Sequence, residues 1–148
     1  MKTRRNFLKK SAIGAVGTML LPNITKARMN KTNKQSEKGF PIVISTWRHG
    51  IPANEGAIKV LQNGGKAIDA VEAGVRIPEA DPEVSSVGFG GWPDRDGHVT
   101  LDACIMDETG NCGSVSFLEN IMHPISVARL VMDKTPHVML AGKGAQQF

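Results

Sequence analysis

Apolar residues along positions 39–148 follow two periods, one typical of strands and one typical of helices. The clearest strand pattern lies in residues 98–106, where every second residue is apolar, as in a half-buried strand. These apolar residues are Val99, Leu101, Ala103 and Ile105. DETGN at 107–111 has the composition of a turn, and CGSVSFL follows it as a second apolar segment. Residues 98–118 are therefore predicted to form a β-hairpin.

Helical spacing of apolar residues predicts three helices. The first covers residues 53–62 and ends before two glycines. The second runs from Ala67 until Pro78 ends it, and a face of small residues permits close approach to a neighbouring element. The third, residues 124–134, opens on a proline, which the first turn of a helix tolerates.

Two further apolar segments complete the predicted order of elements. Residues 41–46 (PIVIST) are rich in β-branched residues and residues 137–141 (HVMLA) are a short apolar run, so both are predicted strands. The order is strand, two helices, hairpin, helix, strand and the start of another helix. It predicts a layered α/β or α+β domain with one sheet edge missing, and residues 39–148 are expected to be its amino-terminal part.

Charge is distributed unevenly along the 148 residues. The hydrophobic fraction of 41% is enough for one domain with a core. Residues 1–38 carry ten Lys or Arg and one acid, whereas residues 39–148 carry eight Lys or Arg and thirteen acids. The net charge of +4 therefore comes from the start of the chain. Because a nucleic-acid interface needs clustered basic residues on the folded domain, we expect no nucleic-acid partner.

The basic start of the chain resembles a twin-arginine export signal. Arg4 and Arg5 precede an apolar run at 11–21, which is shorter than the roughly 20 residues that span a bilayer but suits a signal peptide. We predict that residues 1–38 are a signal peptide and a polar linker, with cleavage near 25–27. The protein would then be exported to the periplasm and not held in a membrane. A basic amphipathic arm of a cytoplasmic protein is the alternative.

Common cofactor and metal motifs do not occur in the sequence. Neither glycine-rich stretch has the spacing GxGxxG of a nucleotide site, and DRDG at 94–97 is not followed by the glutamate of a calcium loop. The four histidines are at least 14 residues apart, so their spacing predicts no metal site. The serine-nucleophile motif GxSxG does not occur either. We therefore expect no cofactor, no metal, and an ordinary Asp-Gly turn at 94–97.

Two cysteines flank the predicted hairpin turn. A four-residue loop would put the thiols of Cys104 and Cys112 on opposite faces, and a three-residue loop would put them opposite each other. Export would permit a disulfide. We expect instead two small buried residues.

Three long stretches resemble one known family. They are STWRHGIPANEGAIKVLQNGGKAIDAVEAGV, SVGFGGWPDRDGHVTLDACIMD and PISVARLVMDKTPHVMLAGKGAQQF, in this order and with similar gaps. They resemble the amino-terminal half of the glycosylasparaginases, amino-terminal-nucleophile hydrolases of the asparaginase type 2 family. The resemblance covers nearly all of residues 41–148 and implies a four-layer αββα sandwich, incomplete in this sequence.

The resemblance also implies a precursor that cuts its own backbone before a threonine, whose hydroxyl then attacks an amide carbonyl. The freed α-amino group acts as the base, since an amide nitrogen cannot. The family's nucleophile follows an aspartate, and none of the eight threonines here does. We therefore expect no catalytic residue in this sequence and a nucleophile beyond Phe148.

One residue of the family's substrate site has a match in this half. A tryptophan just after the first strand helps to wall the substrate pocket in the family, and Trp47 matches it. The resemblance therefore implies that Trp47 binds substrate. An aromatic side chain that caps the core is the alternative for this position.

The function implied by the resemblance is hydrolysis of the amide bond between N-acetylglucosamine and asparagine in glycosylated asparagine. The partners implied are this small substrate and the protein's own β-subunit, with two αβ pairs in a dimer. An L-asparaginase or isoaspartyl peptidase of the same fold is the first alternative. A secreted domain without activity is the second, although half a sandwich would expose a sheet edge and apolar helix faces.

Overall fold

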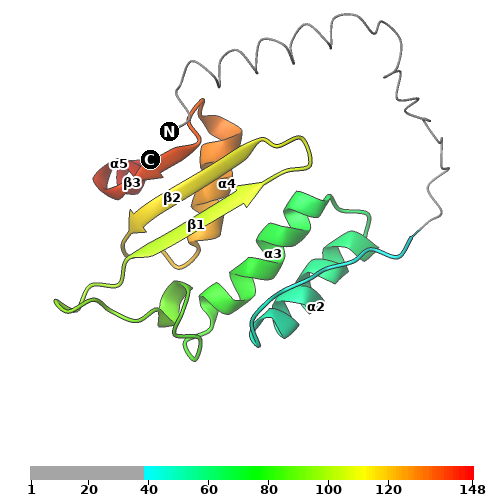
Figure 1. Ribbon diagram of the computed structural model, residues 1–148, viewed down its shortest axis with the longest axis horizontal. Coiled ribbons are helices and arrows are strands. Elements are labelled where there is room, and N and C mark those ends of the chain that lie inside the picture. Colours follow the sequence, from blue (N-terminus) through cyan, green and yellow to red (C-terminus); the bar gives the residue numbers. More distant parts are fainter. Residues whose placement is uncertain (1–38) are drawn as a thin grey trace, which may run out of the picture. The chain divides into compact units, whose positions relative to one another are not determined.

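The computed structural model describes residues 39–148. The predicted signal peptide, its cleavage point and the linker lie outside the described residues. Among the described residues, no helix is long and apolar enough to cross a membrane. The elements follow the chain as α2 (Gly50–Gln62), α3 (Ala67–Ala80), the 3-10 turn η1 (Gly88–Gly90), β1 (Leu101–Met106), β2 (Cys112–Leu118), α4 (Pro124–Lys134), β3 (Met139–Ala141) and α5 (Gly142–Gln147) (Figure 1).

The sheet is small and open, with three strands in the order β1, β2, β3. β1 and β2 form the predicted antiparallel hairpin, and β3 runs parallel to β2 after the crossover through α4. Asp107 fixes the hairpin turn, because its Oδ1 accepts hydrogen bonds from the backbone N–H groups of Thr109 and Asn111. The mixed α+β arrangement predicted from the sequence is thus confirmed.

Helix α4 packs on one face of this sheet and forms the core with it. Figure 1 shows α4 behind β1 and β2. The buried side chains of this core include Ile105, Val115, Leu118, Ile125, Ala128 and Val131. Gly113 in β2 permits the close approach, because a Cβ there would collide with the carbonyl oxygen of Ala128 and the backbone nitrogen of Met132.

Helices α2 and α3 form a pair beside this core. A Cβ at Gly74 would lie 2.7 Å from the carbonyl oxygen of Ala53, so the small-residue face predicted for the second helix does allow a close approach. Arg129 of α4 ties the pair to the core through Asp69 of α3, at 3.2 Å, and also contacts Asp133 at 2.8 Å.

Pro78 does not end α3, contrary to the prediction. The helix runs on to Ala80, where the backbone N–H of Asp81 donates to the carbonyl of Pro78. Both Pro78 and Glu79 are buried, and their packing holds this last turn although the proline ring removes one N–H donor.

The strand predicted at residues 41–46 is not observed, and this prediction is wrong for residues 39–148. The segment has no regular secondary structure and makes no backbone hydrogen bond to other described residues. Its apolar side chains are exposed, with Ile42 at 81% and Ile44 at 85%. A β-branched run forms a strand only where a sheet edge supplies backbone partners, and no described residue supplies one here.

The second face of the sheet is uncovered within residues 39–148. Side chains of a strand alternate between the two faces, and those of β1 and β3 that point away from α4 are exposed, whereas those of the central strand β2 are half-buried. They include Asp102, Cys104 and Met106 of β1, and Met139 and Ala141 of β3. The helices therefore cover one face only.

The cysteine predictions need correction. Met106 pairs with Cys112, and Cys104 pairs with Ser114, so the loop has five residues and neither considered length occurs. Both thiols lie on the same face, on diagonal positions that are typically about 7–8 Å apart. They are free cysteines, and Cys104 is exposed, not buried.

Gly113 provides a test of the contact between α4 and the sheet. In the full-length protein, we expect Gly113→Ala to lower the free energy of unfolding by about 1–3 kcal/mol, because the added methyl group must push α4 away from β2. Urea denaturation followed by circular dichroism measures the change. Gly144→Ala is the matched control, since a Cβ there meets nothing within 4 Å. Equal effects of the two substitutions would contradict the packing described.

Candidate functional site

A tight turn between residues 45 and 50 presents Trp47 at the start of α2. The backbone N–H of Gly50 donates to the carbonyl oxygen of Trp47 at 2.8 Å, which closes the turn. Glycine is required at position 50, because any Cβ there would collide with the side chain of Ser45. The Oγ of Ser45 also lies within hydrogen-bonding distance of Asn54 Oδ1 and of the carbonyl oxygen of Gly50. Side-chain and backbone contacts together fix the turn on α2.

The indole of Trp47 is open to solvent in the described residues. Its exposed fraction is 70%, so Trp47 does not cap a core there. It stacks on the imidazole of His49, with ring centroids 6.1 Å apart and an angle of 7° between the planes. Such an offset parallel arrangement lies in the range that favours aromatic pairs.

A hollow of about 260 Å³ lies beside these two rings. The turn forms one side of it, and the remaining wall is apolar, supplied by Ala53 of α2, Val75 and Pro78 of α3, and Val87. The hollow can hold a small group against aromatic and aliphatic surface. None of the residues that line it is an ionised carboxylate or a lysine. We call it the Trp47 hollow.

The residue after Pro78 brings a buried carboxyl group close to the wall of the Trp47 hollow. Glu79 is 3% exposed, and its Oε1 accepts a hydrogen bond from the backbone N–H of Ile125 at 3.1 Å. This N–H is one of the free donors at the start of α4. His123 precedes α4 without capping it through its side chain, so the cap comes from α3.

Glu79 and His123 form a second contact between α3 and α4. Glu79 Oε2 and His123 Nδ1 are 3.4 Å apart, and both atoms are buried with no hydrogen-bond partner among the described residues. Burial raises the pKa of Glu79 to about 7. Burial, with a smaller contribution from the positive charge of Arg76, lowers the pKa of His123. Both shifts favour the uncharged forms of the two groups over an ion pair.

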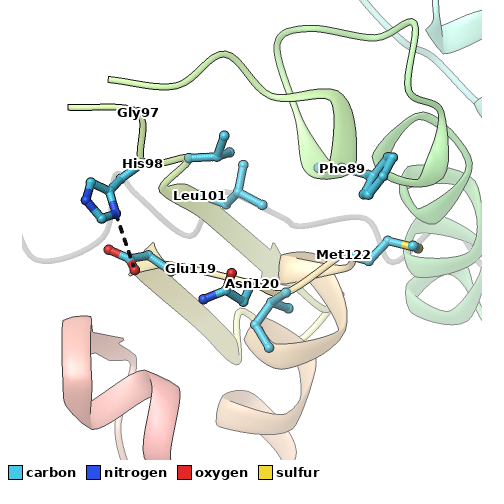
Figure 2. A pocket seen from close by; sticks show the side chains of 10 residues that line it. Phe89, Gly97, His98, Leu101, Glu119, Asn120 and Met122 are labelled. Carbon is cyan, nitrogen blue, oxygen red and sulfur yellow. Dashed lines mark ion pairs between the residues drawn. The ribbon is translucent and has the colours of Figure 1, made fainter. Parts of the chain in front are cut away.

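A larger hollow of about 750 Å³ lies between the loop before β1 and the segment after β2. Figure 2 shows His98 and Glu119 at one end of it and Phe89 and Met122 towards the other. The nitrogen and oxygen of His98 and Glu119 are 4.0 Å apart, and both side chains are substantially exposed. Such an ion pair contributes little. This hollow contains none of the residues predicted from the sequence to bind substrate, whereas the Trp47 hollow contains Trp47.

The remaining motifs resolve into local structure. Asp94 Oδ1 accepts hydrogen bonds from the backbone N–H groups of Asp96 and His98, so the predicted Asp-Gly turn is confirmed. The hydrogen bond from the backbone N–H of His98 is the main cause that lowers the pKa of Asp94. Within residues 39–148, no three His, Cys, Asp or Glu side chains gather in a way that could hold a metal ion.

Trp47 is predicted from the sequence, whereas its neighbour His49 and the buried pair of Glu79 and His123 are not. His49 lies two residues from Trp47, a spacing that carries no signal without the turn geometry. Glu79 and His123 are 44 residues apart and come together only through the packing of α3 against α4. No local pattern in the sequence distinguishes this buried glutamate from the exposed acids around it.

Comparison with known proteins identifies the family. Residues 47–148 match the family model described as asparaginase, and the chain belongs to this family. It is 56% identical over 145 residues to an N(4)-(β-N-acetylglucosaminyl)-L-asparaginase of Elizabethkingia miricola, a match that covers 98% of this chain and 42% of the relative.

Mammalian relatives are also similar over this part. An N(4)-(β-N-acetylglucosaminyl)-L-asparaginase of Mus musculus is 44% identical over 110 residues, 74% of this chain and 32% of the relative. An isoaspartyl peptidase/L-asparaginase of Rattus norvegicus is 45% identical over 97 residues, 65% of this chain and 28% of the relative. The chain thus spans less than half the length of these relatives.

The raised pKa of Glu79 predicts a pH dependence of stability. The folded state binds this proton more tightly than the unfolded state, whose pKa is near 4.5. The resulting stabilisation is complete below about pH 4.5 and is lost as the pH rises through 7, a change of roughly 3 kcal/mol. His123 acts in the opposite direction, because its lowered pKa favours the folded state at higher pH.

Glu79→Gln should remove the Glu79 contribution. We expect the difference in unfolding free energy between wild type and Glu79→Gln to change with pH between 4.5 and 7.5, as measured by urea denaturation of the full-length protein. Glu83→Gln is the control, because this exposed carboxylate lies four residues further on. The same pH-dependent difference for both variants would show that Glu79 is not the group that titrates.

Proposed function

We propose that the protein whose amino-terminal part these residues form hydrolyses the amide bond between N-acetylglucosamine and the side chain of asparagine. The observation that carries this proposal is the 56% identity to the Elizabethkingia relative of that name over 98% of the chain. The Trp47 hollow adds support, since its aromatic and aliphatic wall suits an uncharged part of a small substrate.

The proposed mechanism divides the work between two parts of one precursor. A threonine beyond residue 148 is freed by self-cleavage, its hydroxyl attacks the amide carbonyl, and its own α-amino group takes the hydroxyl proton. The same group passes this proton to the glycosylamine nitrogen as the C–N bond breaks, which leaves an acyl-enzyme. Water then releases the acyl group, with oxyanion donors stabilising both steps. Residues 1–148 supply no nucleophile in this scheme. Their contribution is the substrate wall at Trp47 and the scaffold that holds it.

We also propose that the fold is completed as a four-layer αββα sandwich. The uncovered sheet face opposite α4 supports this arrangement, because a second sheet packed there would bury Met106 and Met139, both more than half exposed here. The apolar segment at 41–46 gives further support, since it lacks a strand partner among the described residues. The partner surfaces would belong to the β-subunit made by self-cleavage, and a dimer of such αβ pairs is part of the same proposal.

An L-asparaginase or isoaspartyl peptidase activity is the second candidate. It is favoured by the 45% identity to the rat isoaspartyl peptidase/L-asparaginase, although that match covers 65% of the chain against 98% for the bacterial relative. The two candidates share the attacking threonine and differ in the group that leaves.

Substrate competition on the purified, self-cleaved full-length protein separates the candidates. We expect kcat/KM for N-acetylglucosaminyl-asparagine to exceed the values for asparagine and for a β-aspartyl dipeptide by at least about tenfold, which corresponds to about 1.4 kcal/mol of transition-state binding. Preference for the dipeptide would support the second candidate. No hydrolysis of any of the three by the self-cleaved protein would contradict both.

The predicted signal peptide supports a separate proposal about where the protein is located. We propose that residues 1–38 direct the folded protein to the periplasm through the twin-arginine route, on the basis of Arg4 and Arg5 before an apolar run. Arg4→Lys together with Arg5→Lys should retain the protein in the cytoplasm, as measured by immunoblotting of cell fractions. Lys9→Arg together with Lys10→Arg is the control, because it preserves the charge and the arginine pair. Unchanged export of the first variant would contradict the proposal.

A further inference from the structure

The stack of Trp47 on His49 suggests a role for a residue that the proposed function leaves unassigned. Trp47 is 70% exposed, so few contacts restrict its indole. Among residues 39–148, His49 supplies the one aromatic ring that stacks on it, in planes 7° apart. An exposed indole without such a partner would sample several staggered side-chain conformations.

The backbone turn brings Trp47 and His49 close enough for their rings to stack. The hydrogen bond from the N–H of Gly50 to the carbonyl of Trp47 closes the turn that contains both residues. His49 itself adopts helical dihedral angles, φ −69° and ψ −7°, immediately before α2. The contacts of Ser45 with Gly50 and Asn54 then fasten the turn to the helix. The turn and its attachment therefore place the two side chains where their rings can stack.

Trp47 and His49 are both among the residues that line the Trp47 hollow. Val75 and Pro78 of α3 also line this hollow. A ligand in the hollow would contact Trp47, and the orientation of the Trp47 indole depends on its stack with the imidazole of His49. Ordering a free side chain at the moment of binding lowers affinity, whereas a side chain already held in place incurs little further loss.

We propose that His49 is a positioning residue, which holds the indole of Trp47 parallel to its own ring and so preorganises the substrate-binding wall. This inference rests on the proposed function for its effect on KM, because it takes Trp47 as a contact of the substrate. The stack itself does not depend on that function.

The kinetic test uses the self-cleaved full-length protein with N-acetylglucosaminyl-asparagine as substrate. We expect His49→Ala to raise KM about three- to tenfold, the cost of ordering one side chain, while kcat stays within about twofold. His49→Phe should restore KM, since a planar ring can stack in the same place. Arg48→Ala is the control from the same exposed turn and should leave KM unchanged. An unchanged KM in His49→Ala, or no rescue by His49→Phe, would overturn the proposal.

A double-mutant cycle separates positioning from a general structural effect. In a Trp47→Ala background, His49→Ala should change KM by less than about twofold, because the ring that it positions is gone. The same increase in both backgrounds would overturn the proposed coupling.

A spectroscopic test keeps the inference separate from the proposed function. The emission of Trp47 is obtained as the difference between a protein and its Trp47→Phe counterpart, with and without His49→Ala. We expect the Trp47 emission to be quenched more strongly by acrylamide after His49→Ala and to return towards the wild-type value with His49→Phe. Quenching that His49→Ala does not change would overturn the stack. A protein that shows the change in quenching but no hydrolysis would instead contradict the proposed function.

Discussion

The packing of α4 against one face of the sheet is the contact on which the rest of the described structure depends. Gly113 lets β2 approach the backbone of α4 at residues 128–132, and the buried core lies along this contact. From α4, Arg129 and the start of the helix then reach α3, and α3 in turn holds α2 through Gly74. The position of the Trp47 turn follows from this chain of contacts.

The same packing explains why one face of the sheet is buried and the other is exposed among the described residues. Helix α4 packs on one side of the sheet, and Cys104, Met106 and Met139 on the strands remain exposed among the described residues. The segment at 41–46 is likewise apolar and lacks a backbone partner. Such surface is unfavourable in water when it stays uncovered. The turn that carries Trp47 begins directly after this segment, so the candidate site adjoins this exposed apolar segment.

Local patterns in the sequence predicted the elements whose formation depends on local interactions. The hairpin followed from alternation and from the turn at Asp107, and the third helix from its proline and its apolar face. The prediction of a strand at 41–46 failed because a strand needs hydrogen-bond partners on a neighbouring strand. The composition of the segment alone does not show whether such a neighbour exists. The face of the sheet on which Cys104 and Cys112 lie depends on the length of the hairpin loop, and the composition of the turn did not determine this length.

The candidate site was predictable only in part, for the same physical reason. Trp47 was named through a resemblance, and its place beside a hollow agrees with that prediction without testing it. The stack with His49 requires the turn geometry, and the buried pair of Glu79 and His123 requires the contact between α3 and α4. A carboxyl group takes its unusual pKa from burial, and burial is decided by tertiary packing.

The most direct test of the central claim is amide hydrogen exchange at residues 41–46 in the full-length protein. The claim is that these residues and the uncovered sheet face belong to a larger sheet structure completed by the remainder of the protein. It predicts that the amides of Ile42 and Ile44 exchange as slowly as those of β2, because a strand partner binds them. Exchange at the rate of an unprotected peptide would contradict it, and the segment would then be an exposed arm.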